Sequence, residues 1–83
     1  MNYNIETEHI IIYPNPLRNY LYFYFTGNSK TAIFELYNMQ GCQLISKTIT
    51  DNEKLNLADL NSGIYLYNLY IDGNMQSGKL RKE

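Results

Sequence analysis

The sequence predicts an all-β protein, an Ig-like antiparallel β-sandwich of about seven short strands. Three observations support this fold class. Apolar and aromatic residues alternate with a period of two, turn-forming residues separate the alternating runs, and no apolar pattern of helical period is long enough for a helix. At 83 residues, the chain has the size of one small domain.

The first run of β-branched residues, 10–12, leads into Pro14, Asn15 and Pro16. Each proline fixes φ and lacks an N–H, and the residue before each proline is pushed toward extended conformations. In an extended chain the N–H groups of positions i and i+2 point the same way, so these prolines remove consecutive donors from one edge. We therefore expect a stiff, extended connector along whose edge nothing pairs fully.

Residues 20–25, with the sequence YLYFYF, form the next predicted strand. One face carries the apolar residues that we expect to point into the core: Leu21, Phe23 and Phe25. The other face carries three tyrosines: Tyr20, Tyr22 and Tyr24. We expect these tyrosines to cover the outer side of a sheet with their hydroxyl groups in water, although such a stripe also suits a partner-binding surface.

Residues 31–38 resume the alternation, with three apolar residues predicted to face inward: Ala32, Phe34 and Leu36. Asn38-Met39-Gln40-Gly41 interrupts the pattern, and residues 42–50 form the return strand. A glycine at the end of so short a connection predicts a tight hairpin in which Gly41 takes a positive φ. Leu36 and Leu44 are expected to bracket this turn on inward-facing positions.

After a predicted turn at Asp51-Asn52, the second half of the chain is also expected to form short strands separated by turns. Three leucines recur within residues 55–60, too few for a helix, so we expect a short strand and a bend. Residues 64–71 are the longest β-prone run, and their two apolar faces predict a central strand. Asp72-Gly73-Asn74 signals a hairpin turn, and residues 75–82 form the last predicted strand.

Composition excludes several function classes. Seven basic and eight acidic residues nearly balance, so the overall charge gives no argument for nucleic acid or a membrane surface. No apolar run approaches the roughly 18 residues of a membrane span. Three cations lie close to the end of the chain: Lys79, Arg81 and Lys82. A short basic tail of this kind is usually a solvated segment.

Side chains that carry chemistry are scarce. The chain has one histidine, His9, and one cysteine, Cys42, so it contains no metal-ligand spacing, and we expect no metal and no cofactor. Cys42 is interpreted as an inert small hydrophobe. A small hydrolase finds no support, because no Ser-His-Asp order or pair of carboxylates can be assembled. The sequence therefore predicts no catalytic residues and no enzyme.

Several motifs, taken in order, resemble a known family. They are YPNP and LYF within residues 13–23, FELYNMQG at 34–41, LNLADLNSGIYLY at 55–67 and SGKL at 77–80. Their order and spacing resemble the C-terminal sorting domain of proteins exported by the type IX secretion system (Por secretion system) of Bacteroidetes. The resemblance runs from about residue 12 to residue 81. No single motif is decisive, since a Tyr-Asn-x-x-Gly hairpin arises in many sheets.

The resemblance assigns roles to the residues that match the motifs. Pro14, Asn15 and Pro16 correspond to the element through which the cargo's linker passes into the first strands. Residues that look like fold determinants fall in the Asn-x-x-Gly and Leu-x-x-Gly-x-Tyr elements: Asn38, Gly41, Leu60, Gly63 and Tyr65. Because the family's far C-terminal strand is what export needs, the implied recognition segment has six residues: Gly78, Lys79, Leu80, Arg81, Lys82 and Glu83.

The implied function is a secretion signal that the type IX outer-membrane translocon recognises. A fused N-terminal cargo would cross the outer membrane with it. In the family a sortase-like cysteine protease then commonly removes the domain, leaving the cargo secreted or attached to the cell surface, and the residues leave open whether this domain is cleaved or retained as an anchor. Residues 1–8 are expected to be the flexible end of the cargo's linker, and residues 9–83 the sorting domain. The residues alone leave an alternative: an autonomous binding module for carbohydrate or protein that uses the Tyr20, Tyr22 and Tyr24 face.

The terminal segment carries one further expectation. As the last strand of a sandwich, residues 78–83 are predicted to pair on one side only, which leaves backbone groups and cations available to a receptor. Because we expect these positions to be mostly polar and exposed, their removal is predicted to cost little stability while abolishing export.

Overall fold

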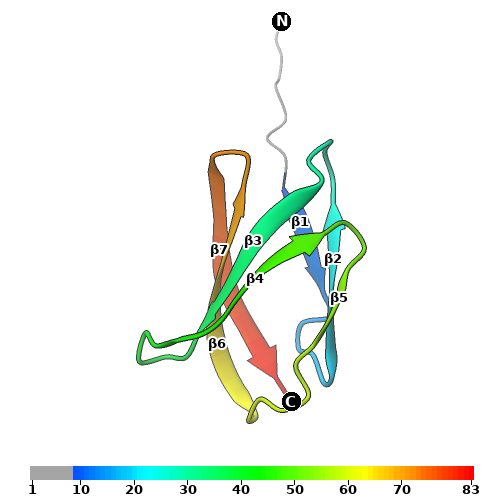
Figure 1. Ribbon diagram of the computed structural model, residues 1–83. Coiled ribbons are helices and arrows are strands. Elements are labelled where there is room, and N and C mark those ends of the chain that lie inside the picture. Colours follow the sequence, from blue (N-terminus) through cyan, green and yellow to red (C-terminus); the bar gives the residue numbers. More distant parts are fainter. Residues whose placement is uncertain (1–8) are drawn as a thin grey trace, which may run out of the picture.

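The computed structural model describes residues 9–83, which form an antiparallel β-sandwich of two sheets (Figure 1). One sheet has the strand order β1-β2-β5 and the other β4-β3-β6-β7. The strands are β1 (Ile10–Tyr13), β2 (Tyr20–Phe25), β3 (Thr31–Tyr37), β4 (Gln43–Thr50), β5 (Lys54–Asn56), β6 (Gly63–Ile71) and β7 (Asn74–Lys82). The predicted all-β sandwich is confirmed, and no helix occurs in this part of the chain. The expected linker, residues 1–8, lies outside the described residues.

The core lies between the sheets, where alternating side chains from both meet. The rings of Phe23 and Phe34 are fully buried and pack edge to face, with centroids 5.1 Å apart. Buried aliphatic residues from both sheets and from the loops also belong to the core: Ile10, Leu17, Leu36, Ile49, Leu57, Leu69, Ile71 and Leu80. The inward faces predicted for residues 20–25 and 31–38 are confirmed, because in a strand a side-chain period of two follows directly from backbone geometry.

The β3–β4 hairpin confirms one prediction and corrects another. Gly41 has a φ of 88°, the positive value expected of a glycine that closes a short turn. A bulge between Leu36 and Tyr37 shifts the register, however, so that Leu36 opposes Ile45, while Leu44 is 43% exposed. The prediction that Leu44 faces inward is wrong, because one extra residue in a strand reverses the face of the neighbouring side chains.

The second half of the chain forms as predicted. The strand β6 pairs with both β3 and β7 and is therefore an inner strand of its sheet. Asp72 and Gly73 both have positive φ, 48° and 79°, and join β6 to β7 in a two-residue turn. Positive φ at both central residues is the signature of the type I′ turn, whose twist suits a hairpin.

The Pro-Asn-Pro segment differs from its prediction. Residues 14–19 reverse the chain between β1 and β2, which pair antiparallel, and the Tyr13–Pro14 and Asn15–Pro16 peptide bonds are cis. The expected extended connector is therefore wrong, since two neighbouring antiparallel strands require a reversal between them.

Candidate functional site

The segment that the family resemblance singles out lies in the second half of β7, an edge strand of the four-stranded sheet. Its side chains alternate between the two faces. Lys79 and Arg81 are exposed on the outer face, whereas Leu80 is fully buried and Lys82 is only 7% exposed. The Lys82 Nζ donates a hydrogen bond to the Glu83 backbone oxygen at 2.9 Å. Two of the three terminal cations are therefore presented to solvent.

The outer backbone edge of this segment is occupied by residues from the Pro-Asn-Pro turn. The Asn15 Nδ2 donates to the Lys79 carbonyl oxygen at 3.1 Å, and the Asn15 Oδ1 accepts from the Arg81 N–H at 3.0 Å. Two positions further on, the Leu17 N–H donates to the Arg81 carbonyl oxygen, and the Leu17 carbonyl oxygen accepts from the Glu83 N–H, both at 2.9 Å. Four outward backbone groups of this segment, from the Lys79 carbonyl oxygen to the Glu83 N–H, are thus paired.

A second amide makes the reciprocal contact from β7 to β1. The Gln76 Oε1 accepts from the Ile10 N–H at 2.9 Å, and the Gln76 Nε2 donates to the Ile10 carbonyl oxygen at 2.6 Å. The two sheets are therefore joined along one side, and we call these contacts of Asn15, Leu17 and Gln76 the edge seam.

Two predictions about residues 78–83 are corrected by this geometry. The segment does not pair on one side only, because Asn15 and Leu17, in the turn that follows β1, bond to outward backbone groups of Lys79, Arg81 and Glu83. Nor is it mostly exposed, since Leu80 and Lys82 both point into the sandwich. An edge strand left bare would be a site of unwanted pairing, and the edge seam removes that exposure.

Gly78 is held in close contact with the residue opposite it on β6. It pairs with Tyr67, and a Cβ atom built on Gly78 would lie 2.9 Å from the Tyr67 Oη and 3.1 Å from two ring carbons. The Tyr67 side chain packs on the core and lies near Phe34, with ring centroids 6.3 Å apart. Covering a strand glycine with a cross-strand aromatic ring stabilises the sheet, so Gly78 has a role in packing.

Substitution of Gly78 by alanine is expected to destabilise the domain by about 1–3 kcal/mol, because the Tyr67 ring must move from a packed position. The neighbouring Ser77→Ala is the control, since Ser77 is exposed and its loss should change stability by less than about 0.5 kcal/mol. Urea unfolding of both variants measures the difference. Equal midpoints for the two variants would contradict the packing role.

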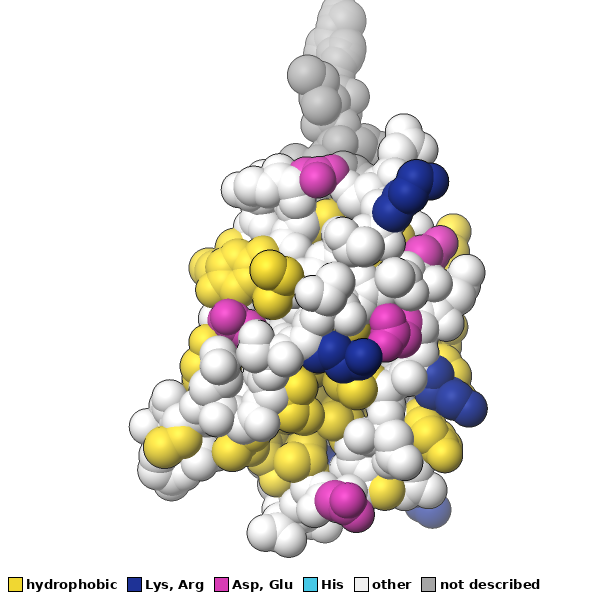
Figure 2. All heavy atoms as spheres, viewed as in Figure 1, with side chains coloured by type: hydrophobic (Ala, Val, Ile, Leu, Met, Phe, Trp, Pro, Cys, Tyr) yellow, Lys and Arg dark blue, Asp and Glu magenta, His cyan; other side chains and the backbone are white. Residues whose placement is uncertain are grey.

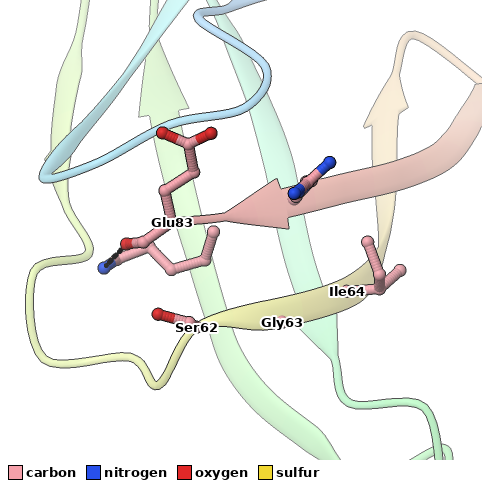
Figure 3. A pocket seen from close by; sticks show the side chains of 6 residues that line it. Ser62, Gly63, Ile64 and Glu83 are labelled. Atoms are coloured by element: carbon pink, nitrogen blue, oxygen red, sulfur yellow. Dashed lines mark hydrogen bonds between the residues drawn. The ribbon is translucent and has the colours of Figure 1, made fainter.

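The end of β7 also borders an open pocket of about 630 Å³ (Figure 3). Residues 62–64 at the start of β6 form one side, and residues 81–83 form the other. Figure 3 shows the labelled Glu83 opposite Ser62 and Gly63. The pocket is a wide surface depression lined by polar and apolar side chains.

The outer face of the four-stranded sheet combines apolar surface with the cations of β7. In one cross-strand row, Ile33 pairs with Tyr70 and Tyr70 with Met75, and all three are exposed. In another row, Leu66 lies opposite Lys79. The pKa of Tyr70 is raised, first by desolvation and then by the nearby Glu35 carboxylate. Figure 2 shows that hydrophobic side chains also reach the surface in several separate places on the face in view.

The tyrosines of β2 lie on the outer face of the three-stranded sheet, as predicted. Tyr20 and Tyr24 are 38% and 46% exposed. The Tyr22 ring stacks on Tyr13 with centroids 5.4 Å apart, and the Lys54 Nζ lies 4.6 Å from the centre of the Tyr20 ring. Much of this stripe is thus in contact with neighbouring side chains of the same sheet.

The other motif residues lie at turns and in the core. The Asn38 Oδ1 accepts from the backbone N–H groups of Gln40 and Cys42, which holds the hairpin loop together. The Tyr65 ring is buried and its hydroxyl donates to the Asn61 carbonyl oxygen at 2.6 Å, while Leu60 packs against the core. These contacts show how the residues stabilise the fold.

Within residues 9–83, no group of three or more His, Cys, Asp or Glu side chains is close enough to hold a metal ion, and no helix is long and apolar enough to cross a membrane. Cys42 is exposed. The pKa of Glu53 is lowered, chiefly by the hydrogen bond from the Thr50 backbone N–H and further by Lys47, whose Nζ lies 3.2 Å from the Glu53 carboxylate. These contacts stabilise the turn between β4 and β5, and β4 lies at the opposite edge of the four-stranded sheet from β7.

Comparison with known proteins identifies the family of this sandwich domain. The family described as "Secretion system C-terminal sorting domain" matches residues 11–83, and the chain belongs to this family. No curated protein sequence matches the chain. The domain is a sorting signal for type IX secretion, and the protein that carries it is secreted or exposed at the cell surface. This match favours the sorting signal over the alternative binding module.

A solved structure shares the fold. The crystal structure of dimeric latent PorU from Porphyromonas gingivalis superposes with a TM-score of 0.60 at 18% sequence identity, covering 94% of this chain and 10% of the PorU chain. At this identity the likeness shows the sandwich architecture. The chain thus spans about a tenth of the length of that structure.

Proposed function

We propose that the folded domain acts as a passive substrate of the type IX machinery and that the translocon recognises the outer face of β7, chiefly the side chains of Lys79 and Arg81. The observation that carries this proposal is the alternation along the terminal segment. Two cations project outward while the backbone edge beside them is already paired. A receptor that meets the folded domain therefore contacts outward side chains rather than free backbone groups.

The path of the chain supports the passage of a fused cargo. The strand β1 begins at one end of the sandwich and β7 ends at the other (Figure 1), so a cargo joined before Ile10 leaves the end of β7 accessible. From Ile10 onward the backbone is paired into the sheet. A sortase-like cysteine protease would therefore act before Ile10, within residues 1–8 as the linker, and release residues 9–83 as the sorting domain.

In this proposal the domain is not an enzyme, and chemistry is done to the chain by its partners. Export would carry the cargo through the periplasm and across the outer membrane, followed by surface attachment or release.

The proposal is tested by the double substitution Lys79→Ala and Arg81→Ala in the full chain fused behind a secreted reporter. Most of the reporter is expected to stay in the periplasm of a bacterium that has the type IX system. The melting temperature should barely change, because each exposed substitution contributes less than about 0.5 kcal/mol. The matched control is Lys30→Ala, an exposed lysine outside β7. Normal export of the double variant would overturn the proposed recognition surface.

A further inference from the structure

We propose that the sorting signal is composite, and that Asn15, near the start of the domain, is a positioning residue for its last strand. Asn15 holds the backbone of Lys79 and Arg81, the two residues whose side chains project outward. The inference rests on the proposed function, in which the export machinery recognises those side chains.

The chemistry of the Asn15 side chain fits this role. A primary amide offers donors and an acceptor, so a single side chain replaces the donor and acceptor of a neighbouring strand. It donates to Lys79 and accepts from Arg81, bracketing the inward-facing Leu80. An aspartate lacks the donor and places a carboxylate beside a carbonyl oxygen. A leucine of similar shape lacks both groups, which leaves backbone groups of β7 unpaired.

Leu17 extends the contact and anchors it. Its backbone pairs with Arg81 and Glu83, and its side chain is fully buried. Pro16, between Asn15 and Leu17, has no N–H. Its position therefore offers no backbone donor to another strand. The Pro-Asn-Pro turn therefore covers the edge of β7 without creating a new donor edge.

Gln76 provides the matched comparison within the same seam. Like Asn15, it joins two segments through one amide that both donates and accepts, and it pairs with Ile10 at the opposite end of β7. Loss of the Gln76 amide should weaken the domain at least as much as loss of the Asn15 amide, because the Gln76 bonds are partly buried and those of Asn15 are exposed. Only loss of Asn15 loosens the backbone that carries Lys79 and Arg81.

The experiment uses the full chain fused behind a secreted reporter, in two pairs of variants. Asn15→Asp and Gln76→Glu add the same charge and remove the same donors, whereas Asn15→Leu and Gln76→Met are the neutral pair. Export is measured as reporter in the supernatant and on the cell surface against reporter in the periplasm. Melting temperature and amide hydrogen exchange of Arg81 are measured on the 83-residue chain.

The expected result is a loss of most export in both Asn15 variants and near-normal export in both Gln76 variants, although the Gln76 variants melt at the same temperature as the Asn15 variants or below it. Exchange of the Arg81 amide should be about fivefold faster in Asn15→Leu, which lacks the acceptor of the Arg81 N–H, whereas Asn15→Asp keeps that acceptor and loses only the bond to the Lys79 carbonyl oxygen. Normal export of the Asn15 variants with faster Arg81 exchange would overturn the proposal. An equal export loss in the Gln76 variants would also overturn it. So would unfolding of both Asn15 variants while the Gln76 variants stay folded, because both of these outcomes indicate that Asn15 acts on stability only.

Failure of the underlying function is recognised separately. Normal export of the Lys79→Ala and Arg81→Ala double variant would show that these two side chains are not the recognition surface. An export loss in that variant, together with normal export of the Asn15 variants, would contradict the positioning role of Asn15 and leave the recognition surface supported.

Discussion

Deletion of residues 78–83 is expected to unfold the domain. It removes Leu80, which is fully buried in the core, and the strand that pairs with the first half of β6. It also leaves Asn15 and Leu17 without their backbone partners. Loss of one buried leucine side chain alone costs about 2–5 kcal/mol, a large part of the roughly 5–15 kcal/mol that stabilises a typical domain. The structure therefore predicts the opposite of the sequence-based expectation, which was that removal of residues 78–83 costs little stability.

Circular dichroism and thermal melting of the truncated chain test this expectation, with the folded Lys79→Ala and Arg81→Ala variant as the control. The truncated chain should lack a cooperative transition. A cooperative transition within a few degrees of the full chain would contradict the burial and pairing of this segment. If the domain unfolds as expected, an export defect after truncation reports on folding, and single exposed substitutions become the informative test of recognition.

The fold was predictable because its signals are local. The alternation in β2 and β3 marks inward and outward residues without reference to the rest of the chain, and Gly41 and Asp72-Gly73 mark their own turns. Leu44 was assigned to the wrong face because a bulge is a property of two paired strands. The residues of one strand do not specify where its partner accommodates an extra residue.

The edge seam was not predictable in the same way, because it joins residues more than 60 positions apart in the sequence. Asn15 was identified through its motif, but the motif does not indicate that its amide pairs with β7. Nothing in the sequence indicates that Gln76 contacts β1, since a polar residue on a strand is usually solvated. Lys82 was expected to be exposed for the same reason, yet the alternation of β7 turns it inward. Leu17 had a usable signal: it is the one apolar residue other than proline among residues 14–19.

Substitution of Leu17 by alanine is expected to destabilise the domain by about 2–5 kcal/mol, the range for buried leucines that leave a cavity. Leu17 lies outside the named strands, yet its side chain is fully buried and its backbone bridges to β7. The same substitution at Leu44, which is 43% exposed, is the matched control and should change stability by less than about 0.5 kcal/mol.

Urea unfolding of the two variants beside the unmodified chain measures both free energies of unfolding. A pattern based on strands alone ranks Leu44, inside β4, above Leu17, in a turn, so the two variants separate the sequence-based assignment from the structural one. Similar losses in both variants, or a larger loss at Leu44, would show that Leu17 does not anchor the turn. A large loss at Leu17 alone would establish that the first turn of the domain and its last strand fold as one unit, because the buried side chain and the paired backbone belong to the same residue.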